Sequence, residues 1–130
     1  MKVKIYYHDT DCGGVVYYSN YLKFLEEART DFFESRGLFL KKLAEDNIMF
    51  VVARQEMDYK LPAHYADILE ISTKVCATSN VKIDFEHEVK NQENKLICKG
   101  RTLLVCVGAD LRPRAMPDEI KKGINEGVTQ

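Results

Sequence analysis

The spacing of the apolar residues changes partway along the chain, and this change limits the folds that the sequence can adopt. Between residues 20 and 36 apolar side chains recur every three or four positions, as on one face of an α-helix. From residue 48 onward the repeat is two, which is typical of strands with one buried face. The strictest alternation runs over residues 82–90, where one face carries Ile83, Phe85, His87 and Val89. The sequence therefore predicts one dominant helix followed by several strands.

The order of these segments predicts the architecture. The four later strands follow one another with short connections and no intervening helix, which favours antiparallel pairing. We therefore expect an α+β fold in which an antiparallel sheet of about five strands packs on one long helix. One helix covers only part of such a sheet, so self-association through the remaining surface or an unpaired edge is expected. The predicted strands are residues 2–7, 49–60, 68–78, 82–90 and 96–107, and the predicted helices are residues 20–36 and 38–46.

The ends of the long helix carry recognisable signals. Ser19 or Asn20 is expected to cap its N-terminus, and Gly37 is expected to follow its last turn. After Ile120 the sequence predicts only a weakly apolar tail.

Composition excludes several classes of protein. The 130 residues fit one domain, and 19 Lys and Arg against 20 Asp and Glu argue against a nucleic-acid binder. No apolar run approaches the roughly 20 residues that span a membrane, and the N-terminal residues do not form a secretory signal, so we expect a cytoplasmic protein. The four cysteines fit no zinc spacing and predict neither a metal site nor disulfides.

Residues 7–21 hold the densest group of chemically useful side chains. Asp9 and Asp11 precede two adjacent glycines, Gly13 and Gly14, and the predicted helix begins soon after. A carboxylate there can simply cap the helix and interact with its positive dipole end. The same arrangement also suits acyl transfer, because free N–H groups at a helix start stabilise an oxyanion and a nearby carboxylate acts as nucleophile or general base. The residues alone leave both interpretations open.

The motif in this segment resembles a known family. D-T-D-x-G-G-V-V-Y, followed by a helix carrying E-x-A-R-T, is similar to the YbgC-type acyl-CoA thioesterases of the 4-hydroxybenzoyl-CoA thioesterase group. FVVARQEMDYKLPAHYADILEI and LLVCV followed by RPRAMP extend the resemblance from about Val3 to Pro117. It implies a single hotdog domain over residues 1–130, with a curved sheet wrapped around the central helix. It also implies homodimers joined edge to edge, often doubled into homotetramers, with active sites at the dimer interface.

The resemblance also implies roles for particular residues. Asp11 matches the catalytic acid, which attacks the thioester carbonyl or activates water, and the backbone N–H of Tyr18 matches the oxyanion donor. Asp9 is then structural. No metal and no cofactor is implied. The predicted substrate-binding residues are Tyr7, Gly13, Gly14, Val16, Ser79, Asn80, Val81 and Lys82.

Several positions allow a second interpretation. Alternation along the first strand places Tyr7 in the core, whereas the family motif places it at the pocket. Many YbgC-type members carry histidine where this chain has Tyr18. His8 is expected at the surface, and Cys12 is a weaker candidate nucleophile. Lys82 is the one charged residue in the stretch 79–82, where the hydroxybenzoyl-CoA enzymes carry a basic cluster. Other candidate phosphate-binding cations are Lys99, Arg101, Arg112 and Arg114.

We therefore expect a thioesterase that converts acyl-CoA and water to a carboxylic acid and coenzyme A. Hydrolysis of acyl groups on acyl carrier protein is an alternative, because the two donors share the phosphopantetheine arm. A non-catalytic hotdog subunit that binds an acyl ligand or a protein is another. The sequence leaves open the acyl chain length, any aromatic preference, the choice between an anhydride intermediate and direct water attack, and the choice between dimer and tetramer.

Overall fold

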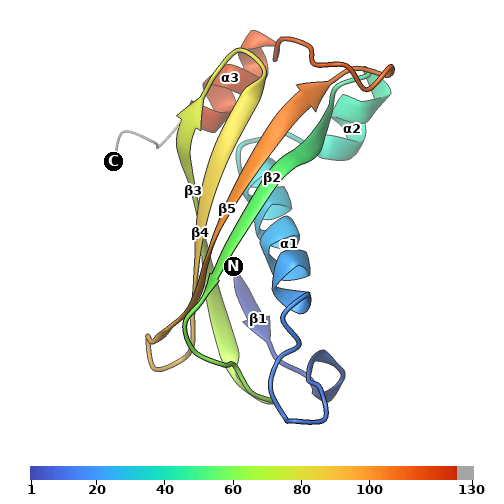
Figure 1. The fold of residues 1–130 in the computed structure, drawn as a ribbon. Coiled ribbons are helices and arrows are strands. Elements are labelled where there is room, and N and C mark those ends of the chain that lie inside the picture. The colour runs from blue at the N-terminus through green and yellow to red at the C-terminus, as the bar shows by residue number, and fades with distance from the viewer. Residues whose placement is uncertain (126–130) are drawn as a thin grey trace.

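The long helix α1 (Asn20–Ser35) lies in the curve of a five-stranded sheet (Figure 1). The computed structural model describes residues 1–125. The strands are in the order β1-β3-β4-β5-β2, and each neighbouring pair is antiparallel. The predicted α+β architecture, a sheet wrapped around one helix, is therefore confirmed. The strand bounds are Lys2–Lys4 for β1, Met49–Tyr59 for β2, Ile68–Thr78 for β3, Lys82–Lys90 for β4 and Leu96–Val107 for β5.

The two ends of α1 behave differently from each other. Gly37 adopts a φ of 74°, and its N–H donates to the Glu34 carbonyl at 3.0 Å while that of Leu38 donates to Phe33 at 2.9 Å. These two bonds satisfy carbonyls of the last turn, so the predicted stop is confirmed. At the start, Ser19 already has helical dihedral angles and its side chain makes no capping hydrogen bond. The Asn20 amide instead donates outward to the Asp9 carbonyl at 2.9 Å. The expected side-chain cap is therefore wrong.

The first strand is shorter than predicted, and this corrects the core placement of Tyr7. β1 ends at Lys4, and Tyr7–Asp9 forms a short 3-10 helix instead of continuing the strand. The Asp9 carboxylate accepts the N–H of Tyr6 at 2.9 Å, a local bond that competes with strand pairing. As a result the Tyr7 side chain is 79% exposed and does not belong to the core.

The segment after Ile120, expected to be a weakly apolar tail, continues a helix that begins at Asp118 and extends to Asn125. α3 (Asp118–Asn125) buries Ile120 and Ile124 in the same apolar cluster as Leu38. Eight residues are too few for a clear helical period, but Pro117 followed by two acidic residues is a helix-start signal that the sequence did contain. A second short helix, α2 (Leu40–Glu45), lies within the predicted range 38–46.

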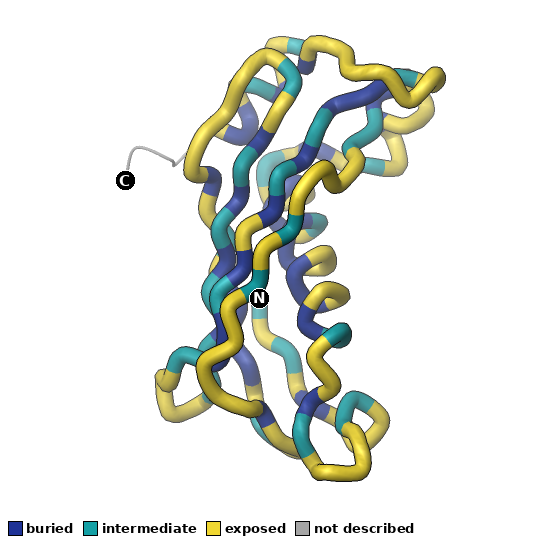
Figure 2. Tube along the Cα trace, viewed as in Figure 1, coloured by how far each residue is buried: buried dark blue, intermediate teal, exposed yellow. Residues whose placement is uncertain are grey.

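The inner face of the sheet packs directly on α1, and Gly100 allows the closest approach. A Cβ atom at this position in β5 would lie 2.6 Å from Cδ1 of Leu25 and 3.0 Å from Sδ of Met57. Leu25 itself is fully buried. Figure 2 shows the buried positions of the helix and of the sheet facing each other along this contact. The missing side chain of Gly100 thus sets how near the helix lies to the sheet.

A row of polar side chains crosses this apolar interior. Arg29 of α1 is only 8% exposed and donates from a guanidinium nitrogen to Thr102 Oγ1 at 3.1 Å, and Thr102 donates to Gln55 Oε1 at 2.7 Å. His87 is fully buried with Nδ1 3.3 Å from the Thr73 hydroxyl, while Nε2 has no partner among residues 1–125. Burial, together with the charge of Arg29, lowers the pKa of His87 to about 4. The histidine is therefore neutral at physiological pH.

The helices of the described part of the chain stay on or beside the sheet. Within residues 1–125, none of them has both the length and the apolar character that crossing a bilayer requires.

Candidate functional site

Between β1 and α1, residues 10–16 form a small two-stranded ribbon that carries Asp11. Thr10 and Val16 pair as an isolated antiparallel bridge, and the Asp11 N–H donates to the Val15 carbonyl at 2.9 Å. Gly14 supplies the positive φ of 79° that the turn requires. Val15 pairs in turn with His64 in the β2–β3 connection. The ribbon is thus fixed on both sides by backbone contacts.

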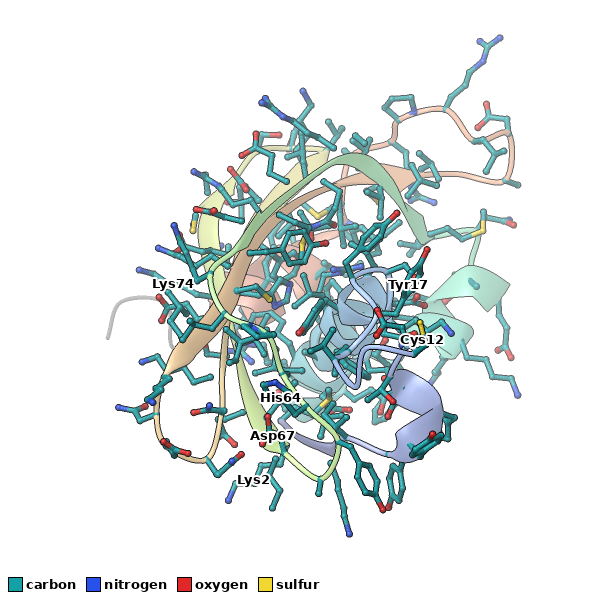
Figure 3. All side chains as sticks on the ribbon, turned by 60° about the horizontal axis from the view of Figure 1, so that its bottom comes forward. Lys2, Cys12, Tyr17, His64, Asp67 and Lys74 are labelled. Atoms are coloured by element: carbon teal, nitrogen blue, oxygen red, sulfur yellow. The ribbon has the colours of Figure 1, made fainter. Side chains whose placement is uncertain are left out.

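Figure 3 shows this end of the molecule. Cys12 and Tyr17 lie on the segment that leads into α1, and His64 and Asp67 lie on the neighbouring connection. The His64 backbone N–H donates to the Asp67 carboxylate at 2.8 Å, and the Gln92 amide also donates to that carboxylate, at 2.9 Å. Asp67 therefore ties the connection together beneath the ribbon.

The two acids of the motif have different environments. Asp11 is exposed, and its Oδ1 accepts the N–H of Gly13 at 2.8 Å, whereas Oδ2 accepts no hydrogen bond from residues 1–125. The Asp9 side chain is only 14% exposed and bonds to Tyr6, while its carbonyl accepts the N–H of Tyr17 at 3.1 Å. Asp9 therefore joins the ribbon to the helix start. One oxygen of Asp11 is held in place and the other is open to a ligand.

Gly13 has a second constraint. A Cβ atom on this residue would lie 3.1 Å from Oδ1 of Asp11, so a side chain would crowd the carboxylate that the backbone N–H holds. Glycine at this position lets the loop approach the acid closely.

The backbone before α1 offers an unused donor. The N–H groups of Asn20 and Tyr21 donate to the carbonyls of Tyr17 and Tyr18, at 2.9 and 3.3 Å. Within residues 1–125 the Tyr18 N–H itself donates to no acceptor. Such a group at a helix start carries partial positive charge and can stabilise an oxyanion.

Tyrosines surround this helix start. Tyr59, the last residue of β2, donates from its hydroxyl to the Tyr18 carbonyl at 3.4 Å, and its ring lies 6.4 Å from that of Tyr18 and 5.8 Å from that of Tyr21. The rings of Tyr17 and Tyr18 are 4.8 Å apart, and the Tyr18 hydroxyl raises the pKa of Tyr17. Sequence periodicity gave no role to Tyr59, because its contacts with the helix start are tertiary.

The remaining predicted residues are divided between two ends of the sheet. Gly13 and Gly14 lie in the ribbon with Asp11, and Val16 is buried beneath it with its N–H bonded to the Ala63 carbonyl. The stretch 79–82 forms the β3–β4 turn, at the opposite end of the molecule (Figure 1). The 11 residues of β3 separate the two groups by roughly 30 Å. One chain therefore does not bring these predicted residues together.

The strand β2 presents a long edge. Within residues 1–125 it pairs with β5 on one side and with no strand on the other. Val51 and Val52, near its start, are 40% and 53% exposed. Long unpaired edges with exposed apolar side chains are sites where another strand adds.

A pocket of about 290 Å³ opens beside this edge, between α1 and β2. Its walls are mainly apolar, and the charged groups are those of Glu26 and Arg29. It is large enough for a short or aromatic acyl group. The other lining residues are Thr30, Phe33, Leu40, Phe50, Val52 and Leu104.

The candidate cations differ in how far they are neutralised. Lys99 lies 3.5 Å from Glu86 and 3.9 Å from Glu88, and Arg101 lies 2.8 Å from Asp84, all on the outer face of the sheet. These two candidates are therefore paired with carboxylates. Lys82 has no carboxylate oxygen within 4 Å among residues 1–125.

Other residues considered for catalysis are less suited to it. The His8 side chain is 82% exposed, in line with its expected surface position. Cys12 is exposed and has no hydrogen-bond partner among residues 1–125. Burial raises the pKa of Cys98 to about 12, so this thiol is not a ready nucleophile. Within the same residues no three potential metal ligands gather at one point.

A comparison with protein families places the chain among known proteins. Residues 6–124 match the model of the thioesterase-like superfamily. The match covers most of the chain and includes the ribbon, α1 and all strands except β1.

Individual proteins agree with this match. The acyl-CoA thioester hydrolase YbgC of Escherichia coli O6:H1 is 36% identical over 119 residues, covering 91% of this chain and 89% of the relative. Among solved structures, a 1,4-dihydroxy-2-naphthoyl-CoA thioesterase from Synechocystis superposes with a TM-score of 0.91 at 22% identity, covering 98% of this chain and 95% of the other. A thioesterase from Thermus thermophilus, solved with coenzyme A and zinc, superposes with a TM-score of 0.86 at 27% identity, covering all of this chain and 94% of the other. The fold is thus the hotdog fold expected from the sequence.

Proposed function

The chain belongs to the thioesterase-like superfamily, in its YbgC group, and is a thioester hydrolase, and we propose that it hydrolyses acyl-CoA with Asp11 as the catalytic carboxylate. The observation that carries this proposal is that the segment leading into α1 holds two groups free to bind a ligand. Asp11 keeps one carboxylate oxygen open, and the Tyr18 N–H is a donor without an acceptor among residues 1–125. Acyl transfer needs these two functions: an attacking or proton-accepting carboxylate and a donor for the oxyanion.

In the first of two routes, Asp11 acts as a general base. It removes a proton from water as the water oxygen bonds to the thioester carbon, and the Tyr18 N–H stabilises the oxyanion that forms. Collapse of this intermediate breaks the C–S bond and expels the thiolate, and Asp11 then releases its proton to the thiolate or to solvent. A thiol pKa near 8.5 makes this leaving group good enough that a dedicated general acid is unnecessary.

In the second route Asp11 is the nucleophile. A carboxylate oxygen bonds to the acyl carbon, the thiolate leaves, and water then hydrolyses the mixed anhydride. Both routes give a carboxylic acid and coenzyme A, and both use the same two groups. The open Oδ2 of Asp11 supports either one.

We further propose that the complete site forms in a homodimer. Two copies that pair antiparallel along β2 place the Tyr59 end of one strand beside the Met49 end of the other. The ribbon of one protomer then lies at the same end as the β3–β4 turn of its partner. This arrangement supports a site with two parts. One part binds the acyl end of the substrate and consists of Asp11, Tyr7, Gly13, Gly14 and Val16. The other part, the β3–β4 turn of the partner, binds coenzyme A. Higher assembly into a tetramer remains a prediction, as do a single domain over residues 1–130 and a cytoplasmic location.

The pocket between α1 and β2 opens at this edge, and we propose that it receives the acyl group. Its apolar walls suit a hydrocarbon or aromatic chain, and its volume of about 290 Å³ favours short or single-ring groups over long chains.

The test is a thiol-release screen of acyl thioesters. Short, long and aromatic acyl groups are presented both on coenzyme A and on acyl carrier protein, to the wild type and to Asp11→Asn. We expect release from acyl-CoA by the wild type and loss of release in the variant. Cys12→Ser is the matched control, because it changes the adjacent exposed residue and should keep full activity. Activity on acyl carrier protein alone would contradict the proposed donor, and binding without hydrolysis would contradict the enzyme.

A further inference from the structure

The β3–β4 turn is in contact with α3, although the two are far apart in the sequence. The Asn80 carbonyl accepts the N–H of Met116 at 2.9 Å, and the Lys121 ammonium donates to Asn80 Oδ1 at 2.5 Å. At the turn itself the N–H of Lys82 donates to the Ser79 hydroxyl at 3.1 Å. The turn is therefore bonded internally, and α3 places a second lysine beside it.

Neither Lys82 nor Lys121 is in a salt bridge with another described residue. Among residues 1–125, no carboxylate oxygen lies within 4 Å of the ammonium nitrogen of Lys82 or of Lys121. Lys99 and Arg101, by contrast, face carboxylates of β4. Among the described residues, Lys82 and Lys121 at the turn therefore have no carboxylate partner, whereas Lys99 and Arg101 are each paired.

The geometry of Lys121 suits a phosphate. An ammonium group has three N–H donors, and Asn80 accepts one of them, so two remain for phosphate oxygens. The contact with Asn80 also restrains the long side chain, which reduces the entropy lost when a ligand binds. Lysine binds phosphate as a point charge, so the position of the nitrogen matters more than its orientation.

We propose that Lys121 of α3 is the second phosphate-binding cation at the β3–β4 turn, acting with Lys82 on the nucleotide phosphates of coenzyme A. This rests on the proposed acyl-CoA hydrolysis. Its consequence is that α3, an element outside the sheet, contributes to the choice of thioester carrier. In the proposed dimer this cation serves the Asp11 ribbon of the partner.

The experiment compares two carriers of the same acyl group. Acyl-CoA has the nucleotide phosphates and acyl-pantetheine lacks them, while the thioester is identical. For Lys121→Gln we expect KM for acyl-CoA to rise about three- to tenfold with unchanged kcat, which is the size of one lost hydrogen bond of ordinary strength. Kinetics with acyl-pantetheine should stay unchanged, and this also shows that the variant is folded. Lys121→Arg should keep most of the affinity.

Lys122→Gln is the matched control, because it removes the same charge from the next, exposed position of α3. If Lys121→Gln and Lys122→Gln raise KM for acyl-CoA equally, or if Lys121→Gln affects both carriers alike, the Lys121 site is wrong and the proposed hydrolysis stands. If the wild type releases thiol from neither carrier, the proposed function itself is wrong.

Discussion

Replacing Gly100 by alanine tests how tightly α1 packs on the sheet. The position of the helix start depends on this packing. The new methyl carbon would lie 2.6 Å from Cδ1 of Leu25 and 3.0 Å from Sδ of Met57. Non-bonded carbon atoms are most stable at about 3.5–4.0 Å, so the neighbours must move by roughly 1 Å. Leu25 is fully buried and cannot turn into solvent to relieve the contact.

The expected cost follows from this clash. Overpacking of a core costs about 1–3 kcal/mol, and the lower flexibility of alanine in the unfolded chain returns at most about 1 kcal/mol. We therefore expect Gly100→Ala to lower the free energy of unfolding by about 1–2 kcal/mol in urea denaturation at fixed protein concentration. In a Leu25→Ala background, where the closer of the two contacts is removed, the same substitution should cost less.

Gly108 provides the control. A Cβ atom there would have its nearest contact at 3.5 Å, to Asp110 Oδ1, which is ordinary van der Waals distance. Gly108→Ala should therefore change the free energy of unfolding by less than about 0.5 kcal/mol. Equal stability of Gly100→Ala and Gly108→Ala would refute the close approach of α1 to β5.

Three further substitutions test other contacts. Because the folded-state pKa of His87 is about 4 and the unfolded chain takes up the proton near 6.5, stability should fall as the pH drops through this interval. His87→Phe should reduce that fall by about 2–3 kcal/mol, as measured by urea denaturation between about pH 7 and pH 4.5. Tyr59→Phe removes the hydroxyl bonded to the Tyr18 carbonyl and should lower kcat about two- to tenfold in the thiol-release assay, and an unchanged kcat would argue against this contact. Thr102→Val leaves buried Arg29 without its bonded hydroxyl and should lower the free energy of unfolding by about 1–3 kcal/mol, and no loss of stability would contradict that hydrogen bond.

The sequence predicted the elements whose periodicity extends over many residues. α1 and strands β2 to β5 match the predicted ranges to within one residue. α1, β3, β4 and β5 each carry a row of buried side chains, whereas β2 has no fully buried residue. Tyr7 was misplaced because the strand ends early, where the Tyr6 N–H donates to the Asp9 carboxylate. α3 was missed because eight residues carry too little of a 3.6-residue period.

The sequence predicted which residues belong to the candidate site but not how they are arranged in space. Asp11 and its glycines are adjacent in the chain, so their proximity follows from local geometry. Nothing in the spacing of the residues shows that the stretch 79–82 lies at the far end of the same sheet, because this depends on the strand order. Lys121 and Tyr59 have tertiary contacts with the site that no local pattern encodes.

The central claim is that Asp11 carries the chemistry, and its most direct test is the steady-state kcat of Asp11→Asn on an acyl-CoA that the wild type hydrolyses. Asparagine keeps the oxygen that accepts the Gly13 N–H but loses the charge, so the ribbon should stay intact and the melting temperature unchanged. We predict a fall in kcat of at least about 100-fold with little change in KM. A folded Asp11→Asn enzyme whose kcat lies within about twofold of the wild type would contradict the account.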